Sequence, residues 1–168
     1  MSKEYLAIVK QFKTEFKNYV NMHEDIGVDD PIKTKVFAHP IDPIKANNGE
    51  LPAFFFGYGA ARINDTQYGT GYQGETISII INAVVGKLDT FEGETIDDIT
   101  DSAAVIHQIV RGFVLNETTI VDLDDGMPIS PTMEFRLAGV DTDAQGVSER
   151  EFMTFTIEID WAYPAYVE

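Results

Sequence analysis

The 168-residue chain contains no cysteine. This absence excludes a disulfide framework, a zinc site with cysteine ligands and catalysis by a thiol. The start of the sequence also lacks a basic segment followed by an apolar one, and no apolar run reaches the roughly 18 residues that a membrane-spanning helix needs. We therefore expect a protein produced in the cytosol, with neither a signal peptide nor a membrane anchor.

Short motifs that mark catalytic or cofactor sites are missing as well. The sequence has no HExxH pair, no GxxxxGK[ST] phosphate loop, no GxGxxG turn and no GxSxG elbow. Its three histidines, His23, His39 and His107, fall in three different predicted elements, and a lone helical histidine such as His107 is more often structural than catalytic. We expect no enzymatic activity, no cofactor and no histidine-based metal site.

The segment "DLDDG" at 122–126 has the clustered carboxylates and the glycine that a calcium loop uses. An EF-hand requires Gly at position six and Glu at position twelve, but counting from Asp122 places Met127 and Met133 there. The spacing therefore predicts a hairpin turn, with a cation site as the much less favoured alternative.

Basic residues are scarce: 12 Lys and Arg stand against 28 Asp and Glu, which gives a formal charge of -16. They are also unevenly placed, because residues 1–45 hold seven Lys and seven acids, whereas the remainder holds five basic residues and 21 acids. Dense carboxylates repel phosphates. We expect weak binding to duplex DNA at moderate salt.

Apolar and aromatic residues are abundant, and their spacing predicts two helices. Hydrophobic residues make up 44% of the chain, with eleven Phe and seven Tyr, enough for a sizeable core. Steps of three and four residues predict an amphipathic helix over 2–20 with Ser2 as its N-cap. A second helix is predicted to end near 115–116; its apolar face and its acidic first turn comprise Ile99, Ala103, Ile106, Val110 and Phe113, and Asp97, Asp98 and Asp101.

Strands are expected between and after these helices. "ETISIIINAVVGK" predicts a central strand that is buried on both faces over 79–81, and further strands are predicted at 33–37, after Pro52, and in "TTIVDLD", "TMEFRLAGV" and "REFMTFTIEID". Residues 38–50 predict a long loop, and 59–74, with glycines among tyrosines, a mobile arm that becomes ordered between subunits. The order predicts one domain over 1–168 in the α+β class, with a mostly antiparallel sheet and two main helices packed on one face.

The last strand, 150–160, alternates apolar and polar residues. Phe155, Ile157 and Ile159 are expected to face the helices, while Glu158 and Asp160 form an acidic outer face. Phe152 falls on the wrong parity, which predicts a β-bulge near 153–154. Reversing both charges, Glu158→Lys and Asp160→Lys, is then expected to leave the fold intact and to alter oligomerisation or DNA passage.

The aromatic end of this strand and the aromatic arm are the candidate contact surfaces. Trp161 and Tyr163 are predicted to anchor the strand either on their own domain or on a neighbouring subunit. The predicted interface residues are Tyr68, Tyr72, Glu158, Asp160, Trp161 and Tyr163.

The order of elements carries a resemblance to a known family. An amphipathic helix, a Pro-rich connection, long strands, a second helix and closing strands follow one another, with segments such as "ETISIIINAVVG", "DSAAVIHQIVRGFV" and "REFMTFTIEID". In this order and size, most of the chain resembles the tail terminator, or tail completion, proteins of long-tailed bacteriophages. The loop at 38–50 and the arm at 59–74 are long for a compact terminator, which leaves another neck or tail component open.

The resemblance implies a virion protein, assembled in the host cytoplasm, that forms a hexameric ring at the head-proximal end of the tail. Such a ring ends polymerisation of the tail tube and joins the tail to the head. Its expected partners are the tail tube, head–tail connector proteins and, as a further candidate, the sheath, while DNA passes through the lumen without specific binding. An alternative from another class is a small-molecule or saccharide binding module lined by Tyr58, Tyr68, Tyr72 and Trp161.

Overall fold

The computed structural model describes residues 3–23, 51–67, 71–116, 120, 123–130, 133–143 and 150–164. It confirms the predicted α+β class, with two long helices and a mostly antiparallel sheet. In chain order the elements are α1 (Glu4–Asn21), β1 (Ala53–Gln67), β2 (Tyr72–Gly86), β3 (Thr90–Phe91), β4 (Glu94–Thr95), α2 (Ile99–Leu115), β5 (Met133–Asp143) and β6 (Arg150–Pro164).

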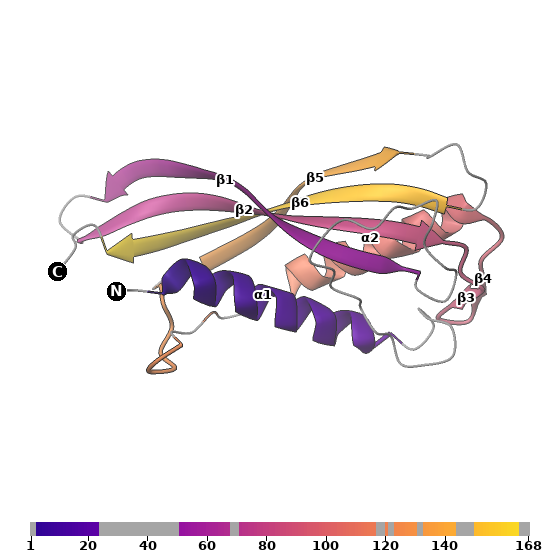
Figure 1. Cartoon of the computed structure of the whole chain (residues 1–168), viewed down its shortest axis with the longest axis horizontal. Helices are drawn as coiled ribbons and strands as arrows, with labels where there is room; N and C mark the ends of the chain where they lie inside the picture. The colour runs from indigo at the N-terminus through magenta and orange to yellow at the C-terminus, as the bar shows by residue number, and fades with distance from the viewer. Residues whose placement is uncertain are drawn as a thin grey trace.

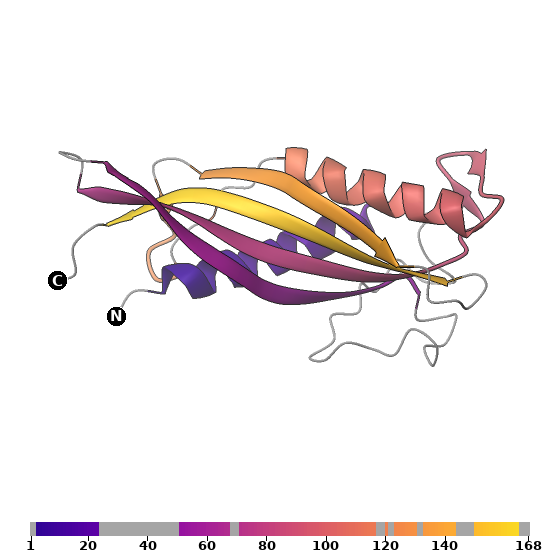
Figure 2. The same ribbon diagram turned by 90° about the horizontal axis from the view of Figure 1, so that it is seen from above.

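The main sheet has four strands in the order β1-β2-β6-β5, and every neighbouring pair is antiparallel. β2 and β6 are the central strands, as the β-branched sequence of β2 predicts. The last strand of the chain thus lies between β2 and β5. Figures 1 and 2 show the strong twist of this sheet and the helices beside it.

Both helices pack on the same face of the sheet, where alternate side chains of β2 and β6 form one core with them. Successive side chains of a strand alternate between the two faces. Ile80 is half-buried on the opposite face, so burial of 79–81 on both faces holds only in part. The buried side chains of β2 and β6 that face the helices are Ile77, Ile79, Ile81, Met153, Phe155, Ile157 and Ile159.

Phe12 of α1 joins the helices to both halves of the sheet. Its ring centroid lies 5.3 Å from that of Phe113 in α2, 6.2 Å from Phe56 in β1 and 6.3 Å from Phe135 in β5. Its side chain is 1% exposed. Aromatic pairs at these separations add to the stabilisation from area burial, so Phe12 holds the layers together.

The helix boundaries match the sequence pattern closely, but one cap does not. α1 begins at Glu4 with Lys3 at the N-cap and no side-chain cap, so the expected cap at Ser2 is wrong. α2 begins after Asp98, whose carboxylate accepts a hydrogen bond from the Asp101 amide at 2.9 Å. The predicted acidic start of α2 is therefore confirmed as a capping arrangement.

Most of the Gly and Tyr segment at 59–74 lies in strands, because β1 continues to Gln67 and β2 starts at Tyr72. This corrects the prediction of a loop, while its ordering between subunits stays a prediction. A Cβ added at Gly59 would lie 2.9 Å from the Ser78 Cβ, which shows that this glycine permits close approach of two strands. Glycine at this position serves strand packing, so it does not indicate flexibility here.

Two other strand predictions need correction or lie outside the described residues. In "TTIVDLD", Ile120 is buried outside any strand and its carbonyl accepts a hydrogen bond from the Ile129 amide, while residues 123–125 form a turn. The turn predicted in "DLDDG" is confirmed there, with the Asp125 carboxylate accepting from the Met127 amide at 2.8 Å. The predicted strand at 33–37 and the predicted loop at 38–50 lie outside the described residues.

The bulge predicted near 153–154 is wrong. β6 pairs with β2 without a register break, and the irregularity lies in β5 between Leu137 and Gly139. Phe152 therefore faces away from the helices, where its ring lies 5.9 Å from that of Phe55. A second small apolar cluster on that face accommodates Phe152, so no change of parity is needed; it consists of Leu51, Ala53, Phe55 and Val84.

Candidate interaction surface

The sheet face opposite the helices carries an arginine–carboxylate network, formed by Arg62, Thr76, Arg136, Glu158 and Asp160. The Arg136 guanidinium donates from Nη1 to Asp160 and from Nη2 to Glu158, and the Thr76 hydroxyl donates to Asp160. The Arg62 Nη2 atom lies 3.6 Å from the Glu158 Oε2 atom. Strand register positions these groups, since Arg136 in β5 lies directly opposite Glu158 in β6.

The network fixes the ionisation of Asp160. Partial burial alone would raise the pKa of this carboxyl, but the hydrogen bonds from Thr76 and Arg136 and the charges of Arg136 and Arg62 outweigh it. The pKa of Asp160 is therefore lowered below its ordinary value of 3.8. The carboxylate is the form that the folded protein stabilises.

The predicted outer facing of Glu158 and Asp160 is confirmed, but the predicted acidic character of that face is not. Their side chains are 21% and 34% exposed, and the two carboxylates are matched by Arg136 of the neighbouring strand β5 and by Arg62 of β1, beyond β2. The sequence of β6 alone does not show that these carboxylates pair with arginines of other strands. Arg136 could be found only by pairing "TMEFRLAGV" with β6 in the correct register.

Trp161 packs on its own domain, which decides between the two alternatives that the sequence leaves open. It is 3% exposed, and its ring lies edge-on to Tyr5 of α1 with centroids 5.4 Å apart. Its Nε1 atom donates to Glu75 Oε1 at 3.3 Å, and the Tyr5 hydroxyl donates to Glu75 Oε2 at 3.0 Å. Glu75, 4% exposed, thus joins β2, β6 and α1.

Exposed apolar side chains lie beside this buried carboxylate. Ile63 of β1 lies opposite Glu75 in the sheet, and the pKa of Tyr58 is raised by partial burial and by the charge of Glu75. We name the three exposed side chains linked to Glu75 the hairpin patch; its members, with exposed fractions, are Tyr5 (42%), Tyr58 (52%) and Ile63 (68%). Sequence analysis missed Ile63, whose only signal is an apolar residue between the polar residues Arg62 and Asn64.

Two of the remaining predicted interface residues, Tyr72 and Tyr163, lie on the paired ends of β2 and β6. Tyr72 is opposite Pro164, and Gln73 is opposite Tyr163, so the backbone brings Tyr72 and Tyr163 onto neighbouring strands. Tyr68 lies outside the described residues. The structure therefore brings Trp161 to the hairpin patch and places Glu158 and Asp160 together on the opposite face of the sheet.

This end of the sheet extends beyond the helices. β1, β2 and β6 have 15 residues each, about 50 Å of extended chain at roughly 3.3 Å per residue. α1 has 18 residues, about 27 Å at 1.5 Å per residue. Figure 1 shows the β1–β2 end of the sheet projecting past the start of α1.

Comparison with models of known protein families gives no match for this chain, and comparison with curated proteins gives no significant match. Among the described residues, no helix has the length and apolar character needed to cross a membrane. Within the same part of the chain, no three His, Cys, Asp or Glu side chains are grouped as metal ligands.

Reversing both carboxylates of the network is now expected to destabilise the fold. Glu158→Lys with Asp160→Lys would place four cations together, so we expect a loss of about 1–2 kcal/mol in the free energy of unfolding. Adding Arg136→Glu should restore part of the loss. Urea unfolding monitored by circular dichroism measures both effects, and full stability of the double variant would show that the network contributes nothing.

Acid unfolding should depend on Asp160. Because the pKa of Asp160 is lower in the folded state, the unfolded chain binds more protons, and stability is lost as pH falls from about 5 through that lowered pKa. Asp160→Asn should show a shallower loss over this range than wild type. Asp89→Asn, at an exposed carboxylate, is the control, and equal slopes for all three proteins would contradict the assignment.

Proposed function

We propose that this chain is a non-enzymatic structural protein of a tailed-bacteriophage virion. In this proposal it forms a homo-oligomeric ring, hexameric in the family it resembles, at the head-proximal end of the tail. The ring ends assembly of the tail tube and joins the tail to the head–tail connector. The tail tube and connector proteins are its direct partners, and the sheath is a further candidate.

The observation that carries the proposal is the sheet that extends beyond the helices. The hairpin patch lies at the base of the projecting part, beside the start of α1, with Ile63 68% and Tyr58 52% exposed. Contiguous exposed apolar side chains commonly mark a protein interface. A subunit that presents such an extension to its neighbours is suited to assembly, because the extension supplies contact area that its own helices leave uncovered.

The charge of the chain supports the same role. A formal charge of -16 disfavours attachment to phosphates, as a ring through which DNA passes requires. The arginine–carboxylate network is neutral, with two arginines and two carboxylates, so the outer sheet face adds no dense positive surface there. DNA passing such a surface meets no built phosphate site.

The saccharide-binding alternative loses one of its four aromatic residues. Trp161 is 3% exposed beneath Tyr5, so its ring is not available to stack on a sugar. Tyr58 remains exposed on β1, but as a member of the hairpin patch. The geometry therefore favours a protein contact at this end of the molecule.

Immuno-electron microscopy tests the proposal. Antibodies raised against the purified chain would be applied to tailed particles produced from the genome that encodes it. We expect gold label at the junction of head and tail in intact particles. Label confined to non-virion material from the lysate would contradict a structural role in the particle.

A further inference from the structure

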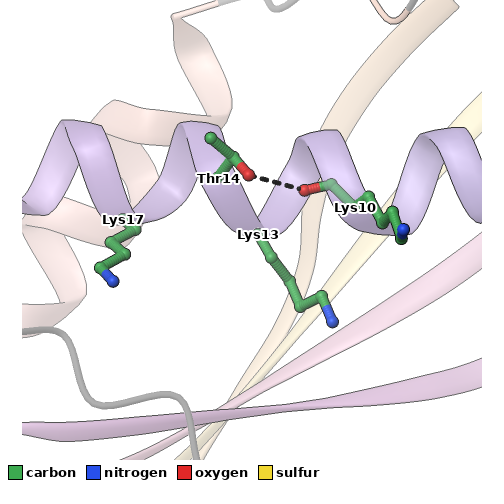
Figure 3. Close-up of a pocket in the computed structure, with 4 residues that line it drawn as sticks. All are labelled: Lys10, Lys13, Thr14 and Lys17. Atoms are coloured by element: carbon green, nitrogen blue, oxygen red, sulfur yellow. Dashed lines mark hydrogen bonds between the residues drawn. The ribbon is translucent and has the colours of Figure 1, made fainter. Parts of the chain in front are cut away.

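The exposed side of α1 carries a stripe of three lysines, Lys10, Lys13 and Lys17, which we name the lysine stripe. Their spacing of three and four residues places them on one side of the helix. The three side chains and Thr14 line an open hollow of about 320 Å³. Figure 3 shows these four residues along α1. Lys10 and Lys17 are exposed, and Lys13 is half-buried.

The stripe is electrostatically unusual for so acidic a chain. Among the described residues, no ion pair involves any of its three lysines, although the chain has 28 Asp and Glu. Like charges three or four residues apart on a helix repel each other. An acidic surface that covers the stripe offsets this repulsion.

The complementary surface lies at another part of the same subunit. The β3–β4 hairpin and the start of α2 carry five exposed acids within ten residues, with Lys87 just before them. Figure 1 shows this part at the end of the molecule opposite the β1–β2 turn. We name it the acidic end: Asp89, Glu92, Glu94, Asp97 and Asp98.

We infer that the lysine stripe of one copy docks against the acidic end of the next copy. The inference rests on the proposed assembly role and names the contact through which it occurs. Two different patches that meet head to tail make a heterologous interface, which closes into a ring when the rotation permits. Complementary charge at such a contact sets the register and speeds association.

Charge exchange between two variants tests this contact. Lys10→Glu with Lys17→Glu makes the stripe acidic, and Asp89→Lys, Glu94→Lys and Asp97→Lys together make the acidic end basic, because the new lysines then outnumber the remaining Glu92 and Asp98; all the substituted positions are exposed, so the fold should persist. Each variant alone should associate at least about tenfold more weakly than wild type in sedimentation velocity. An equimolar mixture should regain association, because both mixed contacts again pair opposite charges.

Salt and a matched single variant provide the controls. Raising the salt concentration from about 0.05 to 0.5 M should weaken wild-type association, since screening shortens the range of the attraction. Lys17→Glu should reduce association, whereas Arg111→Glu, an exposed cation on α2, should leave it unchanged. Circular dichroism of each variant verifies the fold.

Three outcomes would overturn the inference. If wild type and both charge variants assemble equally well, the contact lies elsewhere and the proposed function is not contradicted. If wild type stays monomeric, the inferred contact between copies does not form, and labelling of particles then tests the proposed function separately. Duplex DNA retained by wild type and released by the stripe variant, with unchanged assembly, would assign the stripe to nucleic acid.

Discussion

Phe12→Ala is expected to lower the free energy of unfolding by about 3–5 kcal/mol, the range for loss of a fully buried aromatic side chain. Phe12 is 1% exposed and contacts Phe56, Phe113 and Phe135. Its removal leaves a cavity between α1, α2 and two strands, and no neighbouring side chain can fill this cavity without moving a layer. Urea unfolding monitored by circular dichroism measures the effect.

A matched control separates burial from general effects of alanine. Leu115→Ala, at the end of α2, removes an apolar side chain that is 68% exposed and should change the free energy of unfolding by less than about 0.5 kcal/mol. Similar losses for Phe12→Ala and Leu115→Ala would mean that α1 is not packed on the sheet as described.

Trp161→Ala is expected to have a comparable effect, a loss of about 3–5 kcal/mol. The substitution removes a ring that is 3% exposed and also removes the Nε1 donor to Glu75. The Tyr5 ring then loses its edge-on partner, so the start of α1 should detach more readily from the sheet. If Trp161 instead served only a neighbouring subunit, the stability of the dilute monomer would not change.

Trp161→Phe separates packing from hydrogen bonding at the same position. Phe keeps most of the apolar ring but leaves Glu75 Oε1 without this donor, which should cost about 1–3 kcal/mol. Hydrogen exchange of the α1 amides gives an independent reading, because faster exchange near Tyr5 is expected in both variants. Exchange unchanged from wild type would show that Glu75 and Trp161 do not hold α1.

Side-chain periodicity predicts most of the fold. The apolar steps of α1 and α2 and the alternation in β6 follow directly from which side must be buried, and the α+β class follows from the order of these elements. Within β6, Phe155, Ile157 and Ile159 are fully buried, as their alternation predicts. Burial of one face depends on the local spacing of apolar residues, so it can be predicted from a single sequence.

Contacts between distant strands are not predictable in the same way. Arg136 meets Glu158 and Asp160 only because β5 and β6 pair in one register, and a shift of one residue would send Arg136 to the other face. Glu75 meets Tyr5 and Trp161 across three elements. Neither set has a sequence spacing that identifies it.

The hairpin shows how one local signal can mislead. Glycines among tyrosines at 59–74 predict a flexible loop, yet Gly59 lies where β1 approaches Ser78 of β2 too closely for a side chain. Phe152 shows the converse. Its side chain packs in a second apolar cluster around Phe55 on the other face of the sheet, so no bulge is needed to turn it toward the helices. In both cases tertiary packing decides between two interpretations that the sequence supports equally.

Sedimentation velocity of the wild-type chain over a wide concentration range tests the assembly role most directly. Heterologous contacts that close predict a shift from monomer to one discrete oligomer, without a continuous series of larger species. Electron microscopy of the oligomer fraction should show rings with a central opening. A single monomeric boundary at every concentration up to about 1 mM, at which even a contact with a millimolar Kd would be populated, would contradict a subunit that closes a ring by itself.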